Sequence, residues 1–209
     1  MYQLTDSVIQ DALDILSGRD RLLADIYHRH GKPPLWARAQ NFATLVHIIL
    51  EQKVSLSSAN AVMGRVRKLC PGMQPAEFLL LADSDLRNAG VSGSKVAYCQ
   101  SIAHSLVSRE LSLPRLRKLD DEDVIARLTS VHGIGPWTAG VYLMMALRRP
   151  DAWASGDRAL VVSYAECAGL DEIPSYAELD KVAASWSPHR ATAARLLWHA
   201  YLKKRNRQL

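Results

Sequence analysis

One carboxylate stands out among the side chains that could carry out chemistry. Asp157 follows the segment RRPDAWASG, a loop with proline, glycine and small residues, and it precedes an apolar segment with helical spacing. A carboxylate in such a place can stabilise a developing positive charge, and it can orient or deprotonate an attacking water. The alternative is that Asp157 only caps the following helix, because aspartate is a favoured N-cap residue.

A pair of glycines forms the second feature, in the segment VHGIGPWT at 131–138. Pro136 suits the first turn of a helix, because a backbone donor is not needed there. Glycine at Gly133 and Gly135 allows positive φ and lets a second backbone approach closely. The amides and the dipole of a helix that begins here could hold a phosphate. A plain glycine corner between packed helices is an equally open interpretation.

The sequence gives no support to several other chemistries. Seven histidines are scattered along the chain, and no His/Cys/Asp cluster indicates zinc or another transition metal. Cys70, Cys99 and Cys167 lie far apart and fit neither a disulfide framework nor an iron–sulfur spacing. We therefore expect reduced and mostly buried thiols. No catalytic Ser/His/Asp or Cys/His set is indicated either.

The composition is that of a packed protein with a mild excess of positive charge. A chain of 209 residues with 48% hydrophobic residues can bury a core of its own. The formal net charge of +5 permits a polyanionic partner without requiring one. No window approaches the ~18 apolar residues of a membrane span, and the acidic N-terminal segment does not resemble a secretion signal. We expect a soluble protein of a reducing compartment.

Apolar residues recur at intervals of three and four along the chain, which is helical periodicity, and strand alternation is nearly absent. Segments such as GKPP at 31–34, CPG at 70–72 and LP at 113–114 are expected to break helices. The pattern predicts an all-α fold of short helices. Their expected ranges are 5–17, 20–30, 40–53, 55–69, 75–89, 94–110, 121–130, 136–148, 157–168, 175–186 and 189–205.

The segment around the glycines resembles the helix-hairpin-helix of a superfamily of DNA glycosylases that pairs this hairpin with a Gly/Pro-rich loop and an aspartate. The matching residues are Gly-Ile-Gly-x-Trp-Thr-Ala at 133–139 and Asp157, which comes twenty positions after Trp137. This spacing is similar to that of the 3-methyladenine DNA glycosylase II type. Three further segments match in order: IILEQKVSLSSANAV at 48–62, LRNAGVSGSKVAY at 86–98 and WSPHRATAARLLW at 186–198.

The resemblance implies an all-α helix-hairpin-helix glycosylase fold with two helical lobes that flank a DNA-binding cleft. We expect one compact domain of this type over residues 1–209, with the hairpin at about 121–148 and the catalytic loop at about 148–158. The lobes would be subdomains of that single domain.

The resemblance also implies the reaction. The expected enzyme is a monofunctional hydrolase that flips an alkylated base, of the 3-methyladenine and 7-methylguanine class, out of duplex DNA and cleaves its N-glycosidic bond during base excision repair. Bifunctional relatives carry a lysine nucleophile at the position of Trp137, so the indole here indicates hydrolysis by water. The alternatives are a glycosylase for other damaged or deaminated bases, or a non-catalytic hairpin module that only binds DNA.

Individual roles follow from the same resemblance. Asp157 is the expected catalytic residue, and Trp137 and Trp198 are expected walls of the base pocket, although core packing is an open alternative for both tryptophans. The residues expected to contact DNA are Gly133, Gly135, Thr138, Gln52, Lys53, Ser55, Ser94 and Lys95.

Several of these roles have alternatives. Lys53 stands where relatives place the wedge that fills the gap left by a flipped base, and it could insert, contact phosphate or only be solvated. Thr138 either caps its helix or meets a phosphate. In the turn that contains Ser94, helix capping by Ser92 or Ser94 competes with DNA contact. Val141 and Arg158 stand where alkyl-purine relatives often have aromatic residues, which leaves the range of bases open.

No cofactor is expected to be required. The resemblance implies a structural Na+ or K+ ion at the hairpin, bound by the backbone carbonyls of Thr129, Val131 and Ile134. The expected partner is double-stranded DNA with a damaged base. We expect a monomer with no membrane partner, in the cytoplasm (nucleoid) of a bacterium or in the nucleus of a eukaryote.

Overall fold

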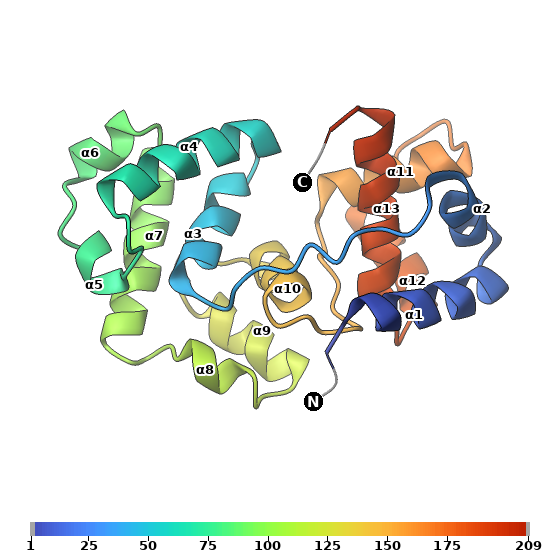
Figure 1. Ribbon diagram of the computed structural model, residues 1–209, viewed down its shortest axis with the longest axis horizontal. Helices are drawn as coiled ribbons and strands as arrows, with labels where there is room; N and C mark the ends of the chain where they lie inside the picture. The colour runs from blue at the N-terminus through green and yellow to red at the C-terminus, as the bar shows by residue number, and fades with distance from the viewer. Residues whose placement is uncertain (1–2, 208–209) are drawn as a thin grey trace. The chain divides into compact units, whose positions relative to one another are not determined.

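The computed structural model describes residues 3–207, and that part of the chain contains helices and no strand (Figure 1). The predicted all-α fold is confirmed. The chain divides into two compact units: the first unit is Met1–Ala37 together with Leu143–Leu209, and the second unit is Arg38–Tyr142. Among the described helices, none has the length and apolar character needed to cross a membrane.

The first unit is built around its last helix, α13, which packs against α1, α2, α11 and α12 (Figure 1). Every residue from Ala191 to Trp198 is buried, and many of them are alanines, so neighbouring helices can approach α13 closely. The helices of this unit are α1 (Asp6–Arg19), α2 (Arg21–His30), α11 (Arg158–Ala168), α12 (Tyr176–Ala184) and α13 (Arg190–Lys204).

A fully buried charge on α13 ties distant segments of the first unit together. The guanidinium of Arg195 donates to the carbonyls of Met144 at 2.6 Å, Leu35 at 2.9 Å and Ala191 at 3.0 Å. A buried cation is costly unless its donors are satisfied, and these three carbonyls supply acceptors. Burial lowers the pKa of Arg195 to about 9, so the group is still charged at neutral pH. The bonds join α13 to the segment after α2 and to the end of α10 (Pro136–Met145).

The second unit has α3 at its centre, because nearly all of the side chains of this helix are apolar and buried. It packs against α4 and α7, and the short helices α5 and α6 pack against α7. The helices that begin in this unit are α3 (Phe42–Glu51), α4 (Leu56–Leu69), α5 (Pro75–Phe78), α6 (Asp83–Asn88), α7 (Gly93–Val107), α8 (Leu113–Leu116), α9 (Asp121–Thr129) and α10.

The prediction of one helix over 75–89 is wrong, because this segment forms α5 and α6. The amides of Leu80 and Leu81 bond to the carbonyls of Glu77 and Phe78, which lie three residues earlier. Such tighter bonds are typical of the last turn of a helix. The chain therefore leaves α5 and starts again at α6.

The predicted ranges also lack a helix between 94–110 and 121–130, where the structure has the short α8 over Leu113–Leu116. Pro114 lies in the first turn of this helix, where a missing amide donor costs nothing. The predicted ends of four other helices are two or three residues too late, since α3, α7, α10 and α12 end at Glu51, Val107, Met145 and Ala184. Fraying makes helix ends uncertain by about that much.

The cysteines behave as expected from the sequence. Cys70 and Cys99 are buried, Cys167 is half-buried, and all three are free thiols. Burial raises the pKa of the Cys99 thiol to about 12, so this side chain is a small apolar group of the core and not a nucleophile.

We predict that Arg195→Met lowers the free energy of unfolding by about 3 kcal/mol or more, because buried carbonyls that lose their donors each cost about 1–3 kcal/mol. Urea unfolding followed by circular dichroism measures the change. The matched control is Arg21→Met at an exposed position of α2, for which we expect a change within about 0.5 kcal/mol. Similar losses for the two variants would contradict the role of Arg195.

Candidate active site

Asp157 lies in the first unit, at the N-terminus of α11, and is 9% exposed. Its Oδ1 atom accepts a hydrogen bond from the amide of Leu160 at 2.9 Å, so the predicted helix cap is present. Gly156 precedes it with φ +83°, a left-handed conformation that few other residues adopt. The cap fixes the carboxylate at the positive end of the helix dipole.

Trp198 contacts the same carboxylate from α13. The indole Nε1 of this residue, which is 6% exposed, donates a hydrogen bond of 3.2 Å to Oδ1 of Asp157. The two donors on one oxygen come from α11 and α13, which pack against each other. Trp198 therefore helps to orient the carboxylate, a role that the sequence did not indicate. Its role as a pocket wall stays a prediction.

The loop before Asp157 is held by a carboxylate on α12. Asp180 accepts hydrogen bonds from the indole of Trp153 at 2.7 Å and from the hydroxyl of Ser155. Trp153 also packs edge-on against Trp186, with 5.8 Å between the ring centroids. These contacts fix the second half of the loop directly before Asp157.

The first half of the loop is fixed by a two-point ion pair with α13. Asp151 accepts hydrogen bonds from Nε and Nη2 of Arg190 at 3.0 and 2.9 Å. Burial raises the pKa of Asp151, but the hydrogen bonds from Arg190 and Ser187 and the charge of Arg190 together outweigh burial and hold this pKa below its ordinary value. The ion pair is therefore intact at neutral pH, and both halves of the loop are anchored.

In the second unit, Gly133 is required by packing. Its φ is +94°, and a Cβ atom placed on it would lie 2.2 Å from Cγ of Tyr98 on α7. The Tyr98 ring in turn packs edge-on against His132, at a centroid distance of 5.0 Å. No substituted residue fits here without a shift of the tyrosine or of the turn. This internal reason for a glycine was not evident from the sequence.

Gly135 is a different case. Apart from Gly135 itself and its neighbours in the chain, no described atom lies within 4 Å of a Cβ atom placed on it, and its backbone is outside the left-handed region. Its carbonyl accepts the first bond of α10, from the amide of Ala139 at 3.0 Å. Within the described chain, packing gives no reason for a glycine at this position. A surface left open by glycine at a helix N-terminus is suited to an external group that approaches the backbone.

The first turn of α10 carries Trp137 and Thr138. Trp137 is half-buried, whereas Thr138 is 1% exposed. The Thr138 hydroxyl accepts a hydrogen bond of 3.0 Å from Nε2 of Gln52. It neither caps the helix nor lies at the surface, so its side chain is directed to another part of the unit.

The turn between α3 and α4 contains three of the predicted DNA-contacting residues. Gln52 is the C-cap residue that follows α3, and its Nε2 also donates to the carbonyl of Gly133 at 3.1 Å. Lys53 is exposed and has φ +56°, and Ser55 caps α4 by accepting from the amide of Ser58 at 3.2 Å. The structure therefore connects this turn to the hairpin through Gln52.

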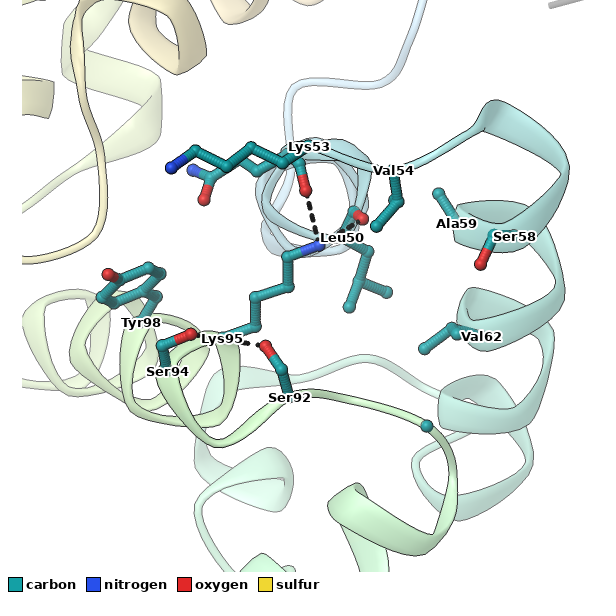
Figure 2. Close-up of a pocket in the computed structure, with 12 residues that line it drawn as sticks. Leu50, Lys53, Val54, Ser58, Ala59, Val62, Ser92, Ser94, Lys95 and Tyr98 are labelled. Atoms are coloured by element: carbon teal, nitrogen blue, oxygen red, sulfur yellow. Dashed lines mark hydrogen bonds between the residues drawn. The ribbon is translucent and has the colours of Figure 1, made fainter.

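The remaining predicted DNA contacts lie at the start of α7. Nζ of Lys95 donates to the carbonyls of Leu50 and Gln52, both at 2.8 Å (Figure 2). Burial lowers the pKa of Lys95. Ser92 holds the N-cap position without a side-chain capping bond, and its hydroxyl lies 3.3 Å from that of Ser94.

The predicted cation ligands belong to one turn of the second unit. Thr129 is the last residue of α9, and Val131 accepts a hydrogen bond of 3.1 Å from the amide of Ile134. In residues 3–207 no group of three or more His, Cys, Asp or Glu side chains could hold a metal ion. The carbonyl site therefore stays a prediction.

The residues that hold the candidate site through long-range contacts are those that the sequence did not reveal. Asp180 lies well beyond Trp153 in the chain, and Arg195 and Tyr98 lie in segments whose role became visible only through their contacts. Their only sequence signal is that Tyr98 and Arg195 fall within segments that resemble the glycosylase family.

Comparison with known proteins defines the family. A family model described as HhH-GPD superfamily base excision DNA repair protein matches residues 46–189, which is more than half of the chain, and the chain belongs to this family. DNA-3-methyladenine glycosylase 1 of Schizosaccharomyces pombe is 27% identical over 165 residues, which cover 77% of this chain and 72% of that protein.

Solved structures agree with this assignment. The 3-methyladenine DNA glycosylase of Schizosaccharomyces pombe in complex with abasic DNA matches with a TM-score of 0.85 and 26% identity, covering 90% of this chain and 95% of that one. A DNA-3-methyladenine glycosidase from Bacillus halodurans matches with a TM-score of 0.75 and 29% identity, covering 99% and 95% of the two chains. The resemblance inferred from the sequence is confirmed.

We predict that Gly133→Ala and Gly135→Ala have different effects on stability. The first change places a methyl group against the Tyr98 ring in a left-handed conformation, so the free energy of unfolding should fall by about 3 kcal/mol. The second fits without a clash and should change it by less than about 1 kcal/mol. Urea unfolding of both variants tests the difference, and equal losses would contradict the packing role of Gly133.

Proposed function

We propose that this protein is a monofunctional DNA glycosylase that removes alkylated bases, of the 3-methyladenine and 7-methylguanine class, from duplex DNA in base excision repair. The observation that carries the proposal is the Asp157 carboxylate, held by the Leu160 amide and the Trp198 indole in a chain of the HhH-GPD family. Relatives with names that specify 3-methyladenine support the choice of substrate class.

The proposed reaction begins when the damaged nucleotide is turned out of the duplex. As the bond between base and sugar breaks, positive charge develops on the sugar ring. Asp157 stabilises this charge electrostatically, and it orients or deprotonates the water that attacks the sugar. A carboxylate whose position is already fixed by two hydrogen bonds needs little reorganisation during the step.

Alkylation itself weakens the bond between the base and the sugar, so the enzyme needs to supply less stabilisation of the transition state. A purine that carries an extra alkyl group on a ring nitrogen is cationic, and it leaves as a neutral base. The electron-rich face of an indole attracts such a cation, so the indole of Trp137 and that of Trp198 are each suited to stack against such a base. Because Trp137 replaces the lysine of bifunctional relatives, the product is an abasic site in an uncut strand.

The proposal assigns DNA contact to backbone groups and exposed turns. Gly135 leaves the N-terminus of α10 open, so amides of this turn can reach a phosphate. Lys53, whose exposure at the turn after α3 supports this role, enters or flanks the gap in the duplex in the proposed complex. The exposed hydroxyls of Ser55 and Ser94 complete the contact surface of the second unit.

A Na+ or K+ ion at the hairpin is a further part of the proposal. Its ligands would be the backbone carbonyls of Thr129, Val131 and Ile134. The last carbonyls of a helix lack partners within the helix and carry its partial negative charge, so the end of α9 fits a small cation. Such an ion would add positive charge where a phosphate binds, and it would not take part in bond cleavage.

The proposed partner is duplex DNA that contains a damaged base, and the protein acts on it as a monomer. The net charge of +5 supports association with a polyanion. The proposed location is with chromosomal DNA, in the nucleoid of a bacterium or in the nucleus of a eukaryote.

One observation favours a second candidate within the same enzyme class. Val141, where alkyl-purine relatives often have an aromatic residue, is 2% exposed, and the residue after Asp157 is Arg158. A pocket with fewer aromatic walls could accept deaminated or oxidised bases in addition to cationic ones. The choice between the two candidates rests on which bases are released.

We predict that the protein releases free 3-methyladenine and 7-methylguanine from methylated duplex DNA, as identified by chromatography of the soluble fraction. The strands should stay intact until alkali cleaves them at abasic sites, and borohydride should trap no covalent complex. Duplexes with single deaminated or oxidised bases serve as the comparison. Release from those duplexes alone would support the second candidate. Duplex binding without release of any base would contradict an enzymatic role.

A further inference from the structure

The turn between α3 and α4 presents side chains outward from a strained backbone. Lys53 adopts φ +56° although it is not a glycine, and Val54 beside it is 46% exposed. A left-handed lysine is energetically unfavourable and persists only when its surroundings hold it. The contacts that hold this turn are therefore informative about its function.

Packing beneath the turn is incomplete. A pocket of about 350 Å³ lies there, with apolar walls from Leu50, Val54, Ala59 and Val62 (Figure 2). The turn therefore spans a hollow instead of resting on close-packed side chains. Directional polar contacts must supply much of what fixes its conformation.

Lys95 supplies the first of these contacts. Its stem forms part of the pocket, and its ammonium group donates to the carbonyls of Leu50 and Gln52 at 2.8 Å each (Figure 2). The last carbonyls of a helix lack partners within the helix, and a cation is favoured beside them. Lys95 thus joins the start of α7 to the end of α3, directly before Lys53.

Gln52 supplies the second contact, through its side chain. Nε2 donates to the carbonyl of Gly133 at 3.1 Å and to the hydroxyl of Thr138 at 3.0 Å, so it ties the turn to the hairpin. Gly133 packs directly against the ring of Tyr98, which lies on α7 like Lys95. The three elements therefore contact one another in a ring. Lys95 of α7 bonds to the turn, Gln52 of the turn bonds to the hairpin, and Gly133 of the hairpin packs on α7.

We propose that Lys95 and Gln52 are positioning residues, which lock the Lys53–Val54 turn to the hairpin so that the two engage the duplex as one preformed surface. This inference rests on the proposed function. It replaces direct DNA contact, the role expected for both side chains from the sequence, because their polar groups already bond within the second unit.

The linkage itself can be tested in the free protein, without DNA. Lys95→Met keeps the length of the side chain but removes its charge and its donors, so amide hydrogen exchange at residues 52–55 should rise about tenfold or more. Lys95→Arg, which keeps donors, should restore part of the protection. The matched control is Lys68→Met on the exposed face of α4, and it should leave exchange at 52–55 unchanged. Unchanged exchange in Lys95→Met would overturn the linkage.

The functional part is tested with a duplex that carries 7-methylguanine next to 2-aminopurine, whose fluorescence reports extrusion of the neighbouring base. Lys95→Met and Gln52→Met should each slow extrusion and single-turnover release by about 10- to 100-fold, because small misplacements are costly. The double variant should be only slightly slower than the worse single variant, since both act through one turn.

Salt dependence distinguishes positioning from direct contact. The slope of log affinity against log salt should be unchanged in Lys95→Met, whereas loss of a phosphate contact would lower the slope by about 0.9. A lowered slope, additive effects in the double variant or extrusion at the wild-type rate would each overturn the proposal. Failure of the wild-type protein to release any methylated base would instead overturn the proposed function, and the exchange result would stand independently of it.

Discussion

Two hydrogen bonds that converge on Oδ1 of Asp157 are the contacts on which the candidate active site depends. One comes from the amide of Leu160 in α11, and the other comes from the indole of Trp198 in α13. The orientation of the carboxylate is therefore set by how these two helices pack. Arg195 lies one turn before Trp198 and fixes α13 through three buried carbonyls. Helix capping and catalysis, which seemed to be alternatives for Asp157, are compatible, because the cap gives the carboxylate its fixed position.

In the second unit, as around Asp157 in the first, long-range polar contacts fix helix ends and turns. Gly133 permits close packing of the Tyr98 ring, while Gly135 leaves the start of α10 uncovered. Glycine thus suits the two positions for different reasons, close packing inside the protein at Gly133 and an open surface at Gly135. Gln52 connects this hairpin with the turn after α3, so neighbouring parts of the proposed DNA surface are not independent of one another.

Local signals in the sequence were enough to predict the all-α fold, the hairpin and Asp157 at the start of a helix. Periodicity and capping act within one or two helical turns, so a single sequence carries them. The same signals misjudged 75–89, where apolar spacing continued across the break between α5 and α6. They could not predict that Trp198 contacts Asp157 or that Lys95 bonds to carbonyls of α3, because such contacts join segments far apart in the chain.

The most direct test of the central claim is single-turnover release of 7-methylguanine by Asp157→Asn. Asparagine caps helices about as well as aspartate, so this change removes the charge and keeps the α11 cap. We expect release to fall by about a hundredfold or more, while the melting temperature and the affinity for the duplex stay close to those of the wild-type protein. Release at nearly the wild-type rate by a folded, DNA-binding variant would contradict the role of Asp157 in the reaction.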